Sequence, residues 1–308
     1  MRYARLLIGA LCLAAALSGC GAAGWWVVVG SGVVAEQVVD LSGFTSVSAA
    51  SGFSVEIAKG DAFAVVVRAD DNVIPLVRAT LEGDQLVLGL EPGLSYWTTV
   101  LHASVTMPEL RGLSCSGGVT ASVGDGFSTD RTLSVALSGG SRLTMASVAC
   151  GGLDVDLSGG SFLSGAASCP LGAATLVLSG GSRLTMASVA CGGLDVDLSG
   201  GSVLDGAASC PQGAATLVLA GGSEVRSLVG SAATLNLMHS GGGRAELSEL
   251  AVDTASVTLA GGAAARVSVQ TSLTATVTGG SSLRYRAFAA GPAVTVVEAS
   301  GGSSIASF

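Results

Sequence analysis

The sequence is poor in charge, in aromatic side chains and, beyond its first 33 residues, in long apolar runs. Only 12% of its 308 residues are charged and 4% are aromatic, and Lys59 is its one lysine. Beyond Val34, apolar residues alternate with Ser, Thr, Asp and Gly. This alternation excludes a bundle of membrane-spanning helices, which needs stretches of about 20 apolar residues. The many small residues favour strands wound closely around a narrow core.

The first residues read as a targeting segment. Arg2 and Arg5 precede the apolar run 6–17, which ends in Leu17-Ser18-Gly19-Cys20. A charged start, a short apolar core and small residues define a secretory signal, and this ending resembles the bacterial lipobox. We expect residues 1–19 to be a lipoprotein signal peptide and Cys20 to be lipidated, so that the mature chain is anchored to the membrane of the cell envelope. An uncleaved helix, or a plain signal with a chance cysteine, is the alternative.

Two further features near Cys20 concern the membrane. Gly21 stands where an aspartate is associated with inner-membrane retention, which favours the outer membrane if the host has one. Trp25 and Trp26 suit a membrane interface, and the segment that they begin reads equally well as a first β-strand.

The mature chain is acidic. Without Arg2 and Arg5 it holds 12 basic and 22 acidic side chains. A surface with this balance repels phosphate backbones, which excludes nucleic acid as a partner. It also excludes adhesion to anionic headgroups by charge alone.

A pair of adjacent glycines recurs every 18 to 22 residues. Most pairs lie in a Ser-Gly-Gly-Ser corner between two alternating apolar segments, and a period near twenty indicates a solenoid. Glycine supplies backbone angles that other residues avoid, and the flanking serines, such as Ser138 and Ser141, can bond the exposed corner backbone. The pairs begin at Gly117, Gly139, Gly159, Gly180, Gly200, Gly221, Gly241, Gly261, Gly279 and Gly301, and the clearest structural corners are Gly139-Gly140, Gly159-Gly160, Gly180-Gly181 and Gly200-Gly201.

Numbering each coil from its first glycine reveals two apolar columns, at two residues before it and four residues after it. Because strand side chains alternate, both columns should face the core while Asp154, Asp156, Asp195 and Asp197 face solvent. About 20 residues at ~3.3 Å give a perimeter of ~65 Å, too short for a wide lumen. Crossovers between parallel strands are right-handed in nearly all cases, so we predict an all-β fold, a right-handed parallel β-helix. The competing left-handed helix needs a six-residue repeat that is not visible.

The chain contains a copied block. Residues 137–177 and 178–218 differ at three positions only. A solenoid accepts such a copy because each repeat contacts only its neighbours. We predict a tether at 20–37, a β-rich N-terminal head at 38–112 and a β-helical solenoid at 113–308.

An ordered set of short motifs between Gly43 and Gly118 resembles the bacterial DUF2807 family, also labelled putative auto-transporter adhesin, head GIN domain. The resemblance implies a secreted or lipid-anchored all-β protein with a β-helical body and no established activity, and it supplies no catalytic residues. The motifs are Gly43-Phe44-Thr45-Ser46-Val47, Val55-Glu56-Ile57-Ala58-Lys59-Gly60-Asp61, Asp70-Asp71-Asn72, Gly83-Asp84-Gln85-Leu86-Val87-Leu88, and Val105-Thr106-Met107-Pro108-Glu109-Leu110 followed by Ser116-Gly117-Gly118.

Four cysteines of the copied block occupy one level of the predicted coils. Cys150, Cys169, Cys191 and Cys210 lie 10 or 11 residues after their glycine pairs. Adjacent coils are ~4.8 Å apart, within disulfide range, and export permits oxidation. We predict possible disulfides Cys150–Cys169 and Cys191–Cys210, with a stack of buried thiols as the alternative.

Other chemistry finds little support. His239 stands in a leucine column, where a local register shift or a core histidine bonded by backbone is the preferred interpretation. Asp70-Asp71-Asn72 is expected to be a solvated acidic turn rather than a cation site. The carboxylates of Asp154 and Asp156 do not converge with those of a neighbouring coil, as a glycosidase requires. We therefore expect no catalytic, cofactor-binding or metal-binding residues.

The sequence thus favours a non-catalytic, lipid-anchored cell-envelope protein, an adhesin or interaction scaffold. Its expected partners are the membrane, through Cys20, and envelope or surface glycans or proteins. A carbohydrate-binding or carbohydrate-cleaving β-helix is one alternative. A structural envelope protein that self-associates through open strand edges is another.

Overall fold

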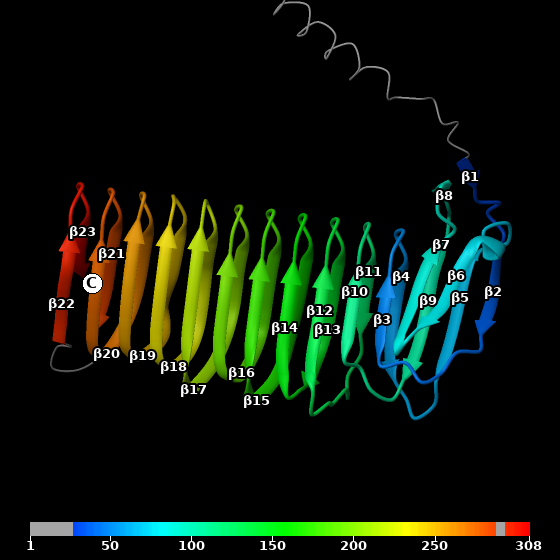
Figure 1. The fold of residues 1–308 in the computed structure, drawn as a ribbon, viewed down its shortest axis with the longest axis horizontal. Coiled ribbons are helices and arrows are strands. Elements are labelled where there is room, and N and C mark those ends of the chain that lie inside the picture. The colour runs from blue at the N-terminus through cyan, green and yellow to red at the C-terminus, as the bar shows by residue number, and fades with distance from the viewer. Residues whose placement is uncertain (1–26, 288–292) are drawn as a thin grey trace, which may run out of the picture.

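The computed structural model describes residues 27–287 and 293–308, and strands make up nearly all of their regular structure. Figure 1 shows a long row of stacked coils with a head at one end. Within the described ranges the one helical element is a 3-10 turn at Ile74–Leu76, and none of their helices is long and apolar enough to cross a membrane. The signal peptide, Cys20, Trp25 and Trp26 lie outside the described residues.

The body is a parallel β-solenoid of about 9 turns with about 21 residues per turn, which confirms the predicted fold class. Short strands form its first coils, namely β10 (Gly112–Cys115), β11 (Thr120–Val123), β12 (Thr132–Leu137), β13 (Arg142–Ala149) and β14 (Gly152–Leu157). Strands that run from one corner to the next follow, namely β15 (Phe162–Leu178), β16 (Arg183–Leu198), β17 (Val203–Ala220), β18 (Glu224–Ser240), β19 (Arg244–Ala260) and β20 (Ala264–Val277). The last coils hold β21 (Ser282–Ala287), β22 (Ala293–Ala299) and β23 (Ser304–Ser307).

Each long strand bends where the register shifts. Between β15 and β16 the shifts fall at Gly165/Ala166 and at Cys169/Ala173. A coil therefore consists of three straight runs, one before the glycine corner and two after it. This agrees with the narrow, three-sided coil expected from the perimeter.

The two predicted apolar columns form the core. Leu157, Leu178 and Leu198 are directly opposite one another in the register of neighbouring coils and are fully buried. Leu163 and Leu184, on the other side of the corner, are also opposite one another and buried. Because every coil adds the same apolar pair to the stack, the core is a continuous rod rather than a single central cluster.

Antiparallel strands cover the N-terminal end of this rod. The first full coil consists of β3 (Ser46–Ala49) and β4 (Ser54–Lys59), which pair in parallel with β10 and β11. On the other side of that coil lie β7 (Gln85–Leu90) and β9 (Leu101–Met107), and these pair antiparallel with β6 (Val77–Glu82) and β5 (Ala64–Asp70). The edge strand β2 (Val34–Val39) pairs with β5, while β1 (Val27–Val29) pairs with β8 (Ser95–Trp97).

These pairings move two of the predicted boundaries. The expected tether at 20–37 contains β1 and the start of β2, which pair with β8 and β5. The solenoid starts near residue 46 rather than at 113, since the first coil turns at Ser51-Gly52 instead of at a glycine pair.

Ser51 is the one non-glycine residue with a positive φ among the described residues, at 62°. It occupies the corner position that glycine holds in later coils, and left-handed angles cost an L-residue roughly 1 to 2 kcal/mol. We expect Ser51→Gly to raise the free energy of unfolding by up to about 1 kcal/mol, measured by urea denaturation. Gly52→Ser, at φ 74° in the same turn, should lower it; a Ser51→Gly variant that is less stable than the parent would contradict this account.

Candidate functional site

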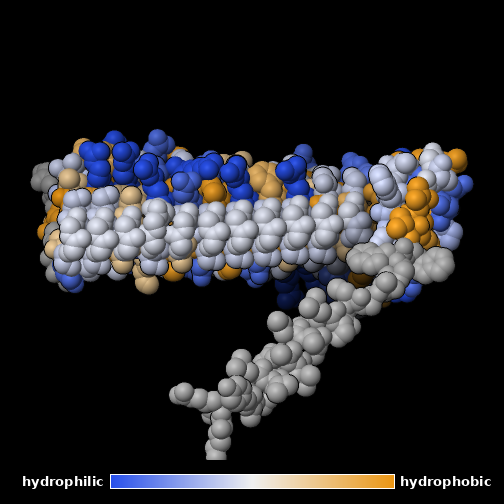
Figure 2. All heavy atoms as spheres, turned by 90° about the horizontal axis from the view of Figure 1, so that it is seen from above, coloured by the Kyte–Doolittle hydropathy of each residue, from blue (hydrophilic) through white to orange (hydrophobic). Residues whose placement is uncertain are grey.

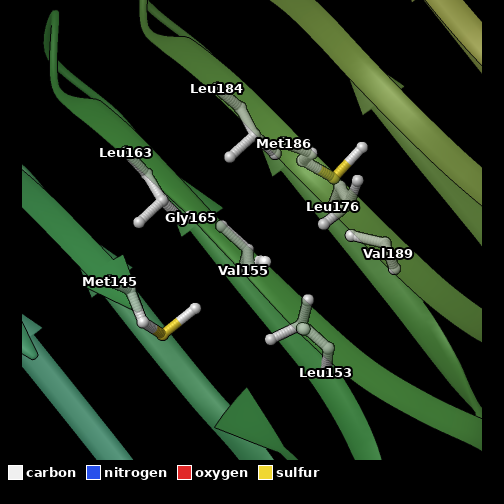
Figure 3. Close-up of a pocket in the computed structure, with 11 residues that line it drawn as sticks. Met145, Leu153, Val155, Leu163, Gly165, Leu176, Leu184, Met186 and Val189 are labelled. Atoms are coloured by element: carbon white, nitrogen blue, oxygen red, sulfur yellow. The ribbon is translucent and has the colours of Figure 1, made fainter. Parts of the chain in front are cut away.

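The interior of the solenoid is filled. A hollow between Met145, Leu163, Gly165 and Met186 measures about 10 Å³ and is lined by apolar side chains (Figure 3). This is about the room needed for one water molecule, and no polar group points into it. This hollow is therefore too small and too apolar to hold a ligand.

The glycine corners form a ridge along one edge of the body. Gly159 and Gly160 have φ values of 61° and 77°, and Ser161 donates its hydroxyl to the carbonyl oxygen of Ser158 at 2.7 Å. The same bond, Ser141 to Ser138 at 2.8 Å, closes the preceding coil. Ser202, Ser223 and Ser281 are likewise buried and bonded within their corners. The ridge therefore offers little beyond glycine backbone, and Figure 2 shows it as a continuous pale band.

Arginines lie on one side of this ridge. The runs that precede the corners between residues 132 and 277 carry no lysine or arginine, and two of them carry aspartates, at Asp154, Asp156, Asp195 and Asp197. The first runs after the corners carry exposed arginines, which we call the arginine face. Hydrophilic side chains gather along one flank of the ridge in Figure 2. The face consists of Arg142, Arg183, Arg226, Arg244, Arg266 and Arg284.

Acidic side chains neutralise the arginine face only in part. Arg226 pairs with Glu224 at 3.0 Å and Arg266 with Glu246 at 3.4 Å, both at the surface. Arg244 and Arg284 form no ion pair within the described part of the chain. Surface pairs contribute roughly 0 to 1 kcal/mol, so these arginines remain available to an anionic partner.

Surface hollows lie against the C-terminal part of the arginine face. A small one of about 100 Å³ is lined by Arg244, Arg266 and Arg284 together with Glu246. A larger and more open one of about 480 Å³ is lined by Arg244, Glu224 and corner glycines. We did not predict this face, although the sequence carries a signal for it: arginine recurs three or five residues after the first glycine of a pair.

The four cysteines of the copied block form the column that their spacing predicts. They are free and buried, and Cys169 lies opposite Cys191 in the register. The interaction between the Cys150 and Cys169 thiols, together with burial, raises the pKa of Cys150, and the same interaction lowers the pKa of Cys169. Cys191 and Cys210 interact in the same way. Because buried thiols are poorly accessible to oxidants, the folded protein should oxidise slowly.

The disulfides themselves stay a prediction. We expect Cys150–Cys169 and Cys191–Cys210 in protein that folds after export under oxidising conditions, because the thiols interact in these pairs. Peptide mapping without reductant measures this. Protein folded in reductant and then exposed to air is the control and should keep four free thiols; Cys169–Cys191 as the main product would contradict the pairing.

His239 lies in register in the core column, opposite Leu219 and Leu259. It is 2% exposed, and neither ring nitrogen has a hydrogen-bond partner within the described structure. A Cβ at Gly243 would lie 2.0 Å from the carbonyl oxygen of Ser223 and 2.9 Å from the His239 Nε2, so both the neighbouring coil and the ring require glycine where most corners have serine. The expected register shift or backbone bond is thus wrong; the imidazole is accommodated sterically.

Burial lowers the pKa of His239 because it disfavours the imidazolium ion. Below about pH 6.5 the unfolded chain binds a proton that the folded chain resists, so stability should fall as the pH falls. We expect His239→Leu to gain about 1 to 2 kcal/mol near neutral pH and to lose this component of the pH dependence. Urea unfolding at pH 5 and pH 8 measures both, and an unchanged slope in the variant would contradict the account.

Of two expectations about acidic residues, the structure confirms the first and contradicts the second. In the register of β14, β15 and β16, Thr175 separates Asp154 from Asp195 and Val177 separates Asp156 from Asp197, so the acids stay apart as predicted. Asp70, expected in a solvated turn, is fully buried. Its carboxylate accepts bonds from the Thr99 side chain and backbone N–H and from the Gly32 N–H, and the bond from the Thr99 hydroxyl contributes most to lowering its pKa.

No group of three or more possible metal ligands is found among the residues that the structure describes. An apolar core, a repeated glycine corner and stacked parallel coils define the class of the protein: a parallel β-solenoid. Within this class, the chain belongs to the DUF2807 family, whose model carries the description "putative auto-transporter adhesin, head GIN domain" and matches residues 43–209 and 172–287. The two matches overlap inside the copied block.

Solved structures share this fold. A "putative adhesin" from Parabacteroides merdae is similar with a TM-score of 0.54 and 15% identity over 92% of this chain and 99% of that chain. A "putative adhesin" from Parabacteroides distasonis is similar with a TM-score of 0.50 and 17% identity over 92% and 100%. At these identities the likeness shows the fold alone. No curated protein sequence matches the chain significantly.

Proposed function

We propose that this protein is a non-catalytic, lipid-anchored protein of the bacterial cell envelope that binds extended partners along its solenoid, as an adhesin or interaction scaffold does. One observation carries the proposal: the coils have no interior room, whereas their outer faces repeat polar and charged side chains at every turn. Membership in a family described as adhesins supports a surface role. A flat repeating face suits a repeating partner better than a small molecule, which is usually held in a concave pocket.

The attachment is through Cys20. Two or more lipid chains hold a protein stably on a membrane, whereas one chain binds reversibly. Metabolic labelling with a fatty acid should therefore mark the wild-type chain, and Cys20→Ser should abolish the label and release the protein from the membrane fraction. Cys12→Ser, within the signal, is the matched control. A Cys20→Ser protein that keeps its lipid label would remove this part of the proposal.

The partner of the arginine face is an anionic polymer, such as a glycan that carries carboxylate or sulfate groups. Arg244, Arg266 and Arg284 come from three successive coils, and coils repeat at ~4.8 Å. Guanidinium groups bind such oxyanions through paired hydrogen bonds. Glu224 and Glu246 also lie on this face, but each pairs with an arginine, whereas Arg244 and Arg284 form no ion pair among the described residues and can bind an anion.

The test compares binding to acidic and neutral polysaccharides. We expect binding to acidic polymers alone, weakened by salt, and reduced at least roughly tenfold when Arg244, Arg266 and Arg284 are all replaced by serine, since a charge-assisted bond contributes about 1.5 to 3 kcal/mol. Arg131→Ser, an exposed arginine away from the face, is the control. Equal binding by the triple variant would refute this role, and release of reducing sugar ends would show a cleaving enzyme instead.

A further inference from the structure

The head carries an exposed apolar patch on its smallest sheet. Val27, Val29 and Trp97 are 55%, 62% and 76% exposed, and we call them the head patch. In the parallel pairing of β1 with β8, Val29 lies opposite Trp97, so their side chains project from one face. Val28 and Tyr96 project from the other face and pack against the core. The apolar residues on the outer face are thus held in place by those on the inner face.

Hydrogen bonds around Asp70 fix the orientation of this sheet. The Gly30 N–H donates to the carbonyl of Trp97 at 2.8 Å, and Asn72 Nδ2 donates to the carbonyl of Val29 at 2.8 Å. The buried Asp70 carboxylate accepts the N–H groups of Gly32 and Thr99, both at 2.9 Å. One carboxylate therefore ties together the chain after β1 and the chain after β8. These bonds hold the sheet that carries the head patch in a fixed position.

The patch lies close in sequence to the expected anchor. Six residues, 21–26, separate Cys20 from β1, and an extended chain spans at most about 3.6 Å per residue. A lipid on Cys20 would therefore hold the head patch within roughly 25 Å of the bilayer. Val33, Val34 and Val38 add exposed apolar side chains on and before β2, and Figure 2 shows hydrophobic surface on the head.

The chemistry of the patch fits a lipid interface better than a protein partner. Tryptophan is enriched where headgroups meet acyl chains, because its ring is apolar and its N–H is polar. A stable protein interface needs about 800 Å² on each partner, more than three side chains can supply. We propose that the head patch lies in the headgroup region of the bilayer that holds Cys20, so that the head rests on the membrane and sets the direction of the solenoid. This proposal depends on the anchoring proposed above.

The test replaces the native lipid by an artificial tether, so that its result does not depend on lipidation. Trp97 becomes the only indole when Trp25 and Trp26, the other two tryptophans of the chain, are changed to phenylalanine. The mature chain is attached to phosphatidylcholine vesicles with nickel-chelating lipid through a histidine tag at either end. Phosphatidylcholine with brominated acyl chains then quenches indoles that enter the interface.

We expect Trp97 emission to shift to shorter wavelength and to be quenched at least twofold more with the N-terminal tether than with the C-terminal one. Equal quenching by both tethers would overturn the proposal. Failure of Cys20 lipidation in cells would leave this measurement unchanged and would instead remove the native anchor.

Variants of the patch provide the second readout. Val27→Thr with Val29→Thr keeps β-branched residues in β1 while removing apolar surface, and it should lower the quenching of Trp97 to the level of the C-terminal tether. Leu171→Thr removes an apolar side chain that is 98% exposed on the solenoid and should change nothing. Full quenching in the valine variant, or a dimer in vesicle-free solution that this variant abolishes, would refute membrane contact.

Discussion

Gly172→Ala should lower the free energy of unfolding by about 3 kcal/mol or more, because adjacent coils leave no room for a methyl group there. A Cβ at position 172 would lie 1.7 Å from the carbonyl oxygen of Gly151 and 2.9 Å from the Cα of Gly152. Both atoms belong to backbone that is paired on its other side, so relief requires two coils to move apart. Overpacking of this kind commonly costs 1 to 3 kcal/mol and sometimes more. Thermal or urea unfolding monitored by circular dichroism measures the loss.

Gly160→Ala is the matched control for this change. Gly160 also adopts a positive φ, at 77°, yet a Cβ there would meet no atom within 4 Å. We expect it to cost only the roughly 1 to 2 kcal/mol of a left-handed conformation. The copied block supplies a replicate, because a Cβ at Gly213 would lie 1.8 Å from the carbonyl oxygen of Gly192. A Gly172→Ala protein as stable as the Gly160→Ala protein would contradict the close approach of the two coils.

Gly159→Val should cost about 3 kcal/mol for a different reason. Gly159 has φ 61°, and a Cβ there would lie 3.1 Å from the backbone nitrogen of Gly139. A β-branched residue tolerates positive φ worse than other residues, and the contact below it adds to the penalty. The corner should lose register, so hydrogen exchange should speed up first at Ser158 and its neighbours.

A valine placed on a straight run is the control, because it separates the cost of the corner conformation from the effect of the valine side chain itself. Thr175→Val has similar volume and lies in the middle of a run, so it should change stability by no more than about 0.5 kcal/mol. A Gly159→Val protein as stable as Thr175→Val would show that the corner does not need glycine. Loss of anionic polymer binding with unchanged stability would instead return the corner to consideration as a binding element.

The glycine pairs support the proposed function indirectly, because the corners that they form bring side chains of successive coils into rows. Each corner turns the chain within a few residues, and this brings the runs before and after it into two stacked sheets. Side chains that share a position in successive coils then form rows at the spacing of β-strands. The arginine face arises in this way from residues about 20 apart in sequence, such as Arg266 and Arg284, which are opposite one another in the register.

The repeated parts of the fold were predictable from the chain. The period, the corner chemistry and the two core columns recur from coil to coil. A deviation at one position therefore does not change the predicted fold. The predictions failed where one coil departs from the pattern. Ser51 conceals the first corner, and His239 fits the core because Gly243, four residues on, lacks a side chain.

The sequence by itself determined that this chain winds into a narrow parallel solenoid, because alternation and glycine spacing are local properties repeated many times. Only the tertiary structure decided which outward residues become neighbours. In the folded chain, Asp70 is buried beside β1 and β8, and Trp97 lies opposite Val29. Arginines of separate coils form one face, and Gly172 lies against Gly151. These arrangements depend on register between segments distant in sequence, and register is settled by the packing of the whole stack.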